Sequence, residues 1–179
     1  MFFLYQSILT LIIIISPIII LIRIFKNKEH RFRYKEKFGS SSKKRAKGKL
    51  IWFHGASVGE ILSIIPLIKI YEKDKSISQI LITSSTLSSS KILGQFKLKK
   101  TIHQFYPIDH FYITKKFLKY WKPDISIFIE SEIWPCMFNQ LEREKIPLLL
   151  INARITKNSF GKWLLFSKFA NQEIGRAHV

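Results

Sequence analysis

Beyond residue 50, short apolar runs alternate with longer stretches in which apolar residues recur every three or four positions. The runs predict buried strands at Leu50–Phe53, Gln79–Thr83, Thr101–Tyr106, Ile125–Ile129 and Leu148–Ile151. The longer stretches predict helices over Glu60–Lys73, from about Ser88, over Phe111–Trp121 and over Ile133–Glu144. This alternation is typical of an α/β fold with a parallel, doubly wound, Rossmann-like sheet. We therefore predict one such domain over residues 50–173.

The N-terminal pattern is different, because residues 1–22 contain no charged side chain and are dominated by Ile and Leu. About 20 apolar residues are enough for a helix to cross a bilayer core. Arg23 and Lys26 follow directly, and positive charge on this flank places it in the cytoplasm. A signal peptide is the alternative, but the sequence lacks a basic region before the apolar stretch and a small-residue cleavage site after it. The sequence predicts a single-pass transmembrane anchor over residues 1–24, with the α/β domain cytoplasmic.

Residues 25–49 are strongly basic, with aromatic residues between the charges. The basic side chains are Lys26, Lys28, Arg31, Arg33, Lys35, Lys37, Lys43, Lys44, Arg45, Lys47 and Lys49. One interpretation is a solvated juxtamembrane linker whose charges only set the membrane topology. The other is an interfacial segment that binds anionic lipid headgroups, with about 1 kcal/mol per basic residue near the surface.

The overall charge supports an anionic partner. Lys and Arg number 30 against 12 Asp and Glu, which gives a formal net charge of +18. Nucleic acid, an anionic membrane and a phosphorylated substrate all fit such an excess. A nucleic-acid-binding protein remains an alternative, but the chain has no RNP-like, helix-turn-helix or zinc-finger signature, so we expect no nucleic-acid partner. Cys136 is the single cysteine, which excludes a disulfide framework and a cysteine-rich metal site.

The turn after the first predicted strand is the main candidate site. A strand that ends in a Gly/Ser turn and opens a helix is where open α/β sheets place ligands. Ser57 and Glu60 have the spacing of a capping box, in which both side chains bind free backbone N–H groups. Glu60 is equally a carboxylate at the mouth of a helix, where it could act as a general base. The spacing alone favours the capping role.

Two further positions carry candidate chemistry at the ends of predicted strands. Glu130 and Glu132 follow the fourth strand and fit a paired acid site, a metal site or an acidic helix start. Arg154 follows the fifth strand, where it could hold a phosphate or a carboxylate or be an ordinary surface arginine. The histidines lack metal-ligand spacing with any cysteine, and no Asp-x-Asp pair is present, so we predict no metal site. The chain also has no G-x-G-x-x-G and no Walker loop.

Three of these stretches, in this order, resemble motifs of the bacterial Kdo transferases. They are His54–Glu60 (HGASVGE), Glu130–Pro135 (ESEIWP) and Asn152–Thr156 (NARIT). That family attaches 3-deoxy-D-manno-octulosonic acid (Kdo) to the lipid A precursor. The resemblance implies a GT-B glycosyltransferase with two Rossmann-like lobes, of which residues 50–173 would be the N-terminal, acceptor-binding lobe. The C-terminal lobe would hold most of the nucleotide.

The resemblance also implies roles for individual residues. Glu60 takes the place of the family's catalytic base. The second motif carries an acidic active-site residue, for which we favour Glu132 over Glu130. The residues expected to bind the acceptor are Ser57, Gly59 and Arg154. The family usually has Asn at the position of Cys136, which removes a polar contact there and leaves the carboxylates unaffected.

The resemblance further implies the partners and the location. The donor would be CMP-Kdo, with no metal and no other cofactor, and the location would be the bacterial inner membrane with its anionic lipids. Family members are roughly twice as long, so we expect this chain to be an N-terminal part that is inactive alone. Residues 174–179 do not continue the family pattern, and we expect them to be a non-native tail. The competing hypothesis is a non-enzymatic, membrane-anchored adaptor.

Overall fold

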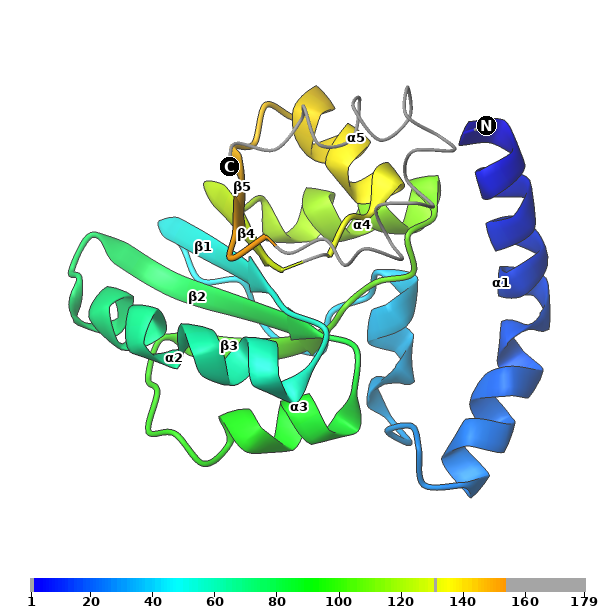
Figure 1. Cartoon of the computed structure of the whole chain (residues 1–179), viewed down its shortest axis with the longest axis horizontal. Helices are drawn as coiled ribbons and strands as arrows, with labels where there is room; N and C mark the ends of the chain where they lie inside the picture. Colours follow the sequence, from blue (N-terminus) through cyan, green and yellow to red (C-terminus); the bar gives the residue numbers. More distant parts are fainter. Residues whose placement is uncertain (1, 131, 154–179) are drawn as a thin grey trace.

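The computed structural model describes residues 2–130 and 132–153 of the chain. Its centre is a parallel five-stranded sheet in the order β3-β2-β1-β4-β5 (Figure 1). The strands are β1 (Lys49–His54), β2 (Ile77–Ser84), β3 (Thr101–Phe105), β4 (Ile125–Ile129) and β5 (Leu148–Ile151). The helices are α1 (Phe2–Phe25), the 3-10 helix η1 (Arg33–Phe38), α2 (Val58–Lys73), α3 (Leu87–Leu93), α4 (Phe111–Trp121) and α5 (Pro135–Arg143). The predicted α/β class with a parallel sheet is confirmed.

Two helix starts differ from the sequence prediction, and both have a local cause. Helix α2 begins at Val58 because Ser57 is extended and its side chain caps the helix. Helix α5 begins at Pro135 instead of Ile133, because Trp134 has extended backbone angles and Pro135 suits the first helical position. Residues 132–134 are therefore free of helix, and they lie at the candidate site.

The helices form one layer on each face of the sheet, with α4 and α5 on one side and α2 and α3 on the other (Figure 1). Successive residues of a strand point to opposite faces. In β1, Leu50 and Trp52 pack with α4 and α5, whereas Ile51 and Phe53 pack with α2. His54, the last residue of β1, points to the same face of the sheet as Trp52.

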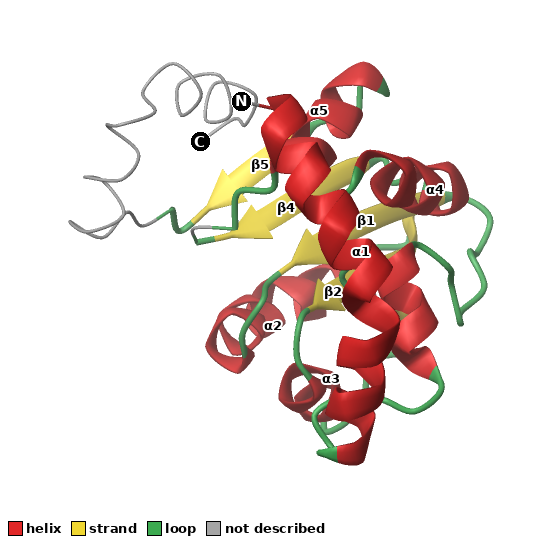
Figure 2. Ribbon diagram, turned by 90° about the vertical axis from the view of Figure 1, so that its right-hand side faces the viewer, coloured by secondary structure: helices red, strands yellow, loops and turns green. Residues whose placement is uncertain are grey.

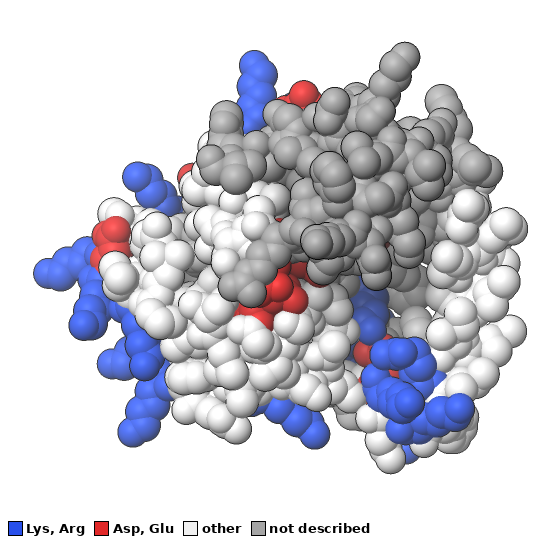
Figure 3. All heavy atoms as spheres, viewed as in Figure 1, with Lys and Arg blue, Asp and Glu red and all other residues white. Residues whose placement is uncertain are grey.

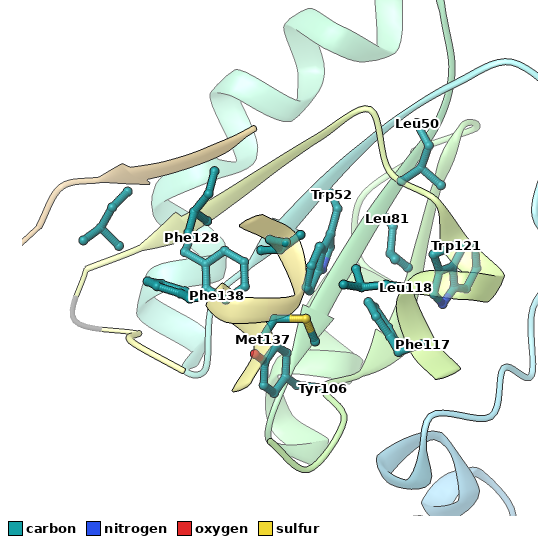
Figure 4. Close-up of a cluster of buried hydrophobic side chains, with 13 residues drawn as sticks. Leu50, Trp52, Leu81, Tyr106, Phe117, Leu118, Trp121, Phe128, Met137 and Phe138 are labelled. Carbon is teal, nitrogen blue, oxygen red and sulfur yellow. The ribbon is translucent and has the colours of Figure 1, made fainter. Parts of the chain in front are cut away.

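The two cores differ in composition. The core beneath α2 and α3 is mostly isoleucine. The core beneath α4 and α5 is aromatic, and Figure 4 shows its side chains clustered between the sheet and the two helices. The Trp52 ring lies 4.9 Å from Phe117 and 5.1 Å from Phe128, centroid to centroid. A polar side chain at the edge of this aromatic core must find hydrogen-bond partners, because unpaired polar groups are costly to bury.

Helix α1 is long and apolar enough to cross a membrane over Tyr5–Phe25, and most of its side chains are exposed. It runs alongside the α/β unit (Figures 1 and 2). Near its start, the Tyr5 hydroxyl donates to Asp109 Oδ2 at 2.8 Å, and the Phe111 N–H donates to Gln6 Oε1 at 3.2 Å. Near its end, Arg23 pairs with Glu29 at 3.3 Å.

Part of the basic segment packs on the edge of the sheet through η1. Glu36 is 1% exposed and accepts hydrogen bonds from Arg33 Nε at 2.8 Å and from the Phe105 N–H at 2.7 Å. Arg33 also donates to the backbone carbonyl of His103 at 2.8 Å. Because β3 is an edge strand, its outer N–H and C=O groups have no neighbouring strand to pair with. The Arg33–Glu36 pair supplies partners for two of these groups, the His103 carbonyl and the Phe105 N–H.

Candidate functional site

The strand order changes direction between β1 and β4, whose connections leave the sheet on opposite sides. In open α/β sheets, ligands bind at such a switch point, outside the carboxyl ends of the strands. Figure 2 shows that β1, β4 and β5 end on the same side of the molecule. The turn after β1 carries Glu60, and the turn after β4 carries Glu130 and Glu132. The fold thus brings the predicted carboxylates to one edge.

Ser57 and Glu60 form a variant of the predicted capping box, in which the Glu60 carboxylate accepts from the N–H of Ala56, one residue before the N-cap residue Ser57. The Ser57 Oγ accepts from the Glu60 N–H at 3.2 Å, and the Ser57 hydroxyl donates to Glu60 Oε1 at 2.7 Å. Glu60 Oε2 accepts from the Ala56 N–H at 2.8 Å. The side chain is half-buried, so its carboxylate is held in place and still reachable. These contacts account for the structural role; the catalytic role stays a prediction.

The glycines of this turn differ in their surroundings. A Cβ added to Gly55 would lie 3.1 Å from Glu60 Cβ and 3.1 Å from Ile129 Cδ1. A side chain at Gly55 would therefore require Glu60 or Ile129 to shift by a few tenths of an ångström. Gly59 has room for a side chain, since its nearest contact would be Ser57 Oγ at 3.9 Å. Gly59 is exposed in the first turn of α2, and its predicted acceptor-binding role stays a prediction.

Glu130 and Glu132 occupy different environments. Glu130 has a φ of +59°, in the left-handed region that is costly for a residue with a long side chain. Its N–H donates to the Ile151 carbonyl at 2.9 Å, which extends the pairing of β4 with β5. Its carboxylate lies 3.5 Å from the side-chain amide of Asn152, whose own φ of +52° is also in the left-handed region. The backbone pairing of Glu130 with β5 fixes the turn after β4, and its predicted active-site role stays a prediction.

Glu132 points to the aromatic side of the sheet and is firmly held. Its Oε2 lies 3.2 Å from His54 Nε2 and accepts from the Trp134 indole N–H at 2.9 Å. Only 19% of the side chain is exposed. Burial by itself raises the pKa of this carboxyl, but the hydrogen bonds from His54 and Trp134 and the charge of His54 outweigh it and hold the pKa below its usual value. Glu132 is therefore an ionised, oriented carboxylate near neutral pH.

His54 lies at the candidate site, although its sequence context assigned it no role. It is fully buried, and its Nδ1 lies 3.0 Å from Thr83 Oγ1 and 3.1 Å from the Thr83 carbonyl oxygen. The Tyr106 ring stacks on it at 3.8 Å. A polar residue at the last position of a buried strand was the available signal, since such a group needs partners from neighbouring elements.

Asp109 is a second residue that the sequence did not indicate. Its carboxylate accepts from the N–H groups of Cys136 at 2.9 Å and Met137 at 2.8 Å, the first turn of α5. A carboxylate at this place satisfies free helix N–H groups and suits the helix dipole. Because the Tyr5 hydroxyl contacts the same carboxylate, Asp109 joins α1 to the start of α5.

Arg154, the third predicted acceptor-binding residue, lies outside the described residues. Within residues 2–130 and 132–153, no group of three or more His, Cys, Asp or Glu side chains is placed to hold a metal ion. Figure 3 shows acidic side chains gathered near the middle of the face it draws, while Lys and Arg lie mostly toward its rim.

Comparison with known proteins gives a consistent result. A family model described as 3-deoxy-D-manno-octulosonic-acid transferase matches residues 32–179. The chain is 48% identical to the 3-deoxy-D-manno-octulosonic acid transferase of Rickettsia felis over 120 residues, which are 67% of this chain and 26% of that protein. It is 41% identical to the Rickettsia bellii transferase over 160 residues, 89% of this chain and 38% of that protein. A probable mitochondrial transferase of Arabidopsis thaliana is 37% identical over 169 residues, 87% of this chain and 38% of that protein.

Proposed function

Because this chain belongs to the 3-deoxy-D-manno-octulosonic-acid (Kdo) transferase family, we propose that it forms the acceptor-binding lobe of a glycosyltransferase. The proposed reaction moves Kdo from CMP-Kdo to the lipid A precursor, lipid IVA. The observation that carries the proposal is the placement of Glu60 and Glu132 on the two turns that flank the switch point of the sheet. The chain spans about a quarter to two fifths of the length of these relatives, so the proposal concerns the longer protein.

In the proposed mechanism, Glu60 is the general base. Its carboxylate takes the proton from a sugar hydroxyl of the lipid acceptor, and the resulting oxygen attacks the anomeric carbon of Kdo. The bond from that carbon to the phosphate oxygen of CMP breaks, and CMP leaves with the electron pair. Attack from the face opposite CMP inverts the anomeric configuration. A phosphate oxygen can leave as an anion, so the proposed step needs no metal ion.

Glu132 is the second active-site carboxylate in this proposal, and it supports substrate orientation. Both hydrogen bonds that it makes with described residues use Oε2. Its Oε1 is thus able to accept from a substrate hydroxyl. A carboxylate held by a buried histidine and an indole loses little conformational entropy when it binds a sugar, which favours precise positioning.

The transfer assay requires a form of the protein extended to the length of its relatives. We expect that form to transfer Kdo from CMP-Kdo to lipid IVA, and this chain alone to be inactive, because the proposed nucleotide-binding lobe lies beyond it. Product would be measured by mass spectrometry, with a reaction lacking CMP-Kdo as the blank. A folded, full-length form that makes no Kdo-lipid product would refute the proposed activity.

We also propose that α1 anchors the protein in the bacterial inner membrane, with the α/β domain in the cytoplasm and the basic segment on anionic lipids. The apolar span and the basic flank support this. Helix α1 has 24 residues and extends about 36 Å, so a spanning α1 would carry Tyr5 away from Asp109 and open that contact. The contact is compatible with a helix that lies along the domain instead.

Topology reporters separate these two arrangements. We expect a reporter fused after Ser40 to be cytoplasmic and an epitope tag at the N-terminus to be accessible from the periplasm. A tag moved to the loop after α2 serves as the cytoplasmic control. If the N-terminal tag is also cytoplasmic, α1 lies along the domain and does not span the bilayer. A periplasmic reporter at Ser40 would contradict both arrangements.

A further inference from the structure

We propose that His54 is a positioning residue that fixes Glu132 for the reaction, with Thr83 and Trp52 as its supports. The role of His54 in catalysis rests on the proposed function. The chain of hydrogen bonds that holds Glu132 lies on the aromatic side of the sheet, and the contacts show it whatever the reaction is. The chain runs from Trp52 through Thr83 and His54 to Glu132.

The two ends of the chain set its direction, because the Trp52 indole can only donate and the ionised Glu132 carboxylate can only accept. The Trp52 indole N–H can only donate, and it lies 2.9 Å from Thr83 Oγ1. The Thr83 hydroxyl accepts that bond and has one proton to donate. Its nearer possible acceptor is His54 Nδ1 at 3.0 Å, and the other is the Phe53 carbonyl oxygen at 3.4 Å. His54 Nε2 then carries the ring proton and donates to Glu132 Oε2 at 3.2 Å. Every polar atom on this path has a partner of the right kind.

Glu132 decides which tautomer of His54 the site accepts. An ionised carboxylate accepts hydrogen bonds and cannot donate them. A neutral ring protonated on Nδ1 alone would turn the Nε2 lone pair toward that carboxylate, which is repulsive. The proton therefore stays on Nε2. Nδ1 has an alternative partner in the Thr83 carbonyl oxygen at 3.1 Å, so it can also bind a proton without losing its hydrogen bond.

The packing around His54 keeps the ring in one orientation. The side chain has no exposed surface. Tyr106 stacks on one face at 3.8 Å between centroids, and Phe128 meets the ring edge-on at 5.0 Å. Interiors packed this closely allow little rotation of a ring. His54 thus transmits the geometry of β1 and β2 to a carboxylate on the turn after β4.

The first test reads the tautomer directly and needs no enzymatic activity. We expect nitrogen-15 NMR of the full chain in detergent, at mildly alkaline pH, to show His54 protonated on Nε2 and bare on Nδ1. Thr83→Val removes the hydroxyl and leaves only the backbone carbonyl oxygen of residue 83 beside Nδ1, so we expect a proton on Nδ1 in addition to the one on Nε2. Thr83→Ser keeps the hydroxyl and should preserve the wild-type pattern. His103 serves as an internal reference, because its Nδ1 faces Arg33 instead of Thr83. A wild-type ring protonated only on Nδ1, or a Thr83→Val spectrum identical to wild type, would overturn the proposal.

The second test measures transfer in the extended protein with a double-mutant cycle. His54→Phe keeps a ring but loses the donor to a charged acceptor, so we expect kcat to fall roughly 10- to 100-fold. His54→Gln, whose amide can reach the Nε2 position, should recover part of the loss. In a Glu132→Gln background, His54→Phe should cost little more, because His54 acts through Glu132. Losses that multiply would overturn the positioning role. If the extended wild-type protein transfers no Kdo, the proposed function fails while the NMR result still decides the hydrogen-bond chain.

Discussion

Replacing Glu60 with Gln in the extended protein lowers Kdo transfer by roughly 100-fold or more, while the melting temperature changes little. The rate falls because an amide cannot take the proton of the acceptor hydroxyl. Stability is retained because the Gln carbonyl can accept the Ala56 N–H bond that Glu60 Oε2 accepts at 2.8 Å. Turnover and melting temperature must both be measured, since only their combination separates a catalytic carboxylate from a capping one.

Glu72→Gln is the matched control for this substitution. Glu72 lies near the end of α2 and accepts from the N–H groups of Lys99 at 3.0 Å and Lys100 at 2.9 Å, just before the start of β3. The chemical change is the same, but it lies at the opposite edge of the sheet from the site. We expect transfer to be unchanged and stability to fall slightly. Full activity in a well-folded Glu60→Gln protein would end the catalytic assignment and leave only the capping box.

Replacing Glu36 with Ala destabilises the protein by about 3 kcal/mol, the lower end of the range for a broken buried ion pair. The substitution leaves the Phe105 N–H of the edge strand without its acceptor and Arg33 without its carboxylate. The effect stays at the lower end because 20% of the Arg33 side chain is exposed and because Arg33 keeps its bond to the His103 carbonyl. The free energy of unfolding would be measured by urea denaturation.

Two further variants make this second result interpretable. Glu36→Gln retains an acceptor for the Phe105 N–H, so we expect a smaller loss than for Ala. Glu144→Ala removes an exposed carboxylate at the end of α5 and should change stability by no more than about 0.5 kcal/mol. A Glu36→Ala protein as stable as Glu144→Ala would show that the pair does not hold the basic segment on β3.

The sequence predicted the elements well where the signal was local. The strands over Ile125–Ile129 and Leu148–Ile151 and the helix over Phe111–Trp121 have the predicted bounds. Their periodicity is contained within each stretch, so no distant contact is needed to recognise them. The predicted start of α5 was two residues too early, because the apolar residues Ile133 and Trp134 fit the helical pattern. Pro135 was the better signal, since the residue before a proline is usually extended.

Local sequence patterns indicated only part of the chemistry of the site. Glu60 could be recognised because its capping partner Ser57 lies three residues away. The resemblance to a known family, and not any spacing rule, indicated a catalytic role for it. The preference for Glu132 over Glu130 had no local basis, since two carboxylates one residue apart look equivalent in a sequence.

By itself, then, the sequence determined the α/β class, the order of the strands and helices along the chain, the apolar N-terminal helix and the turns that carry the carboxylates. Only the tertiary structure decided which residues surround those carboxylates. His54 meets Glu132 across 78 positions in the chain because β1 and β4 are neighbours in the sheet. In the same way, Glu36 reaches the Phe105 N–H because β3 is an edge strand. Strand order sets both contacts, and it arises from how the whole sheet packs its two cores, which no local pattern of residues encodes.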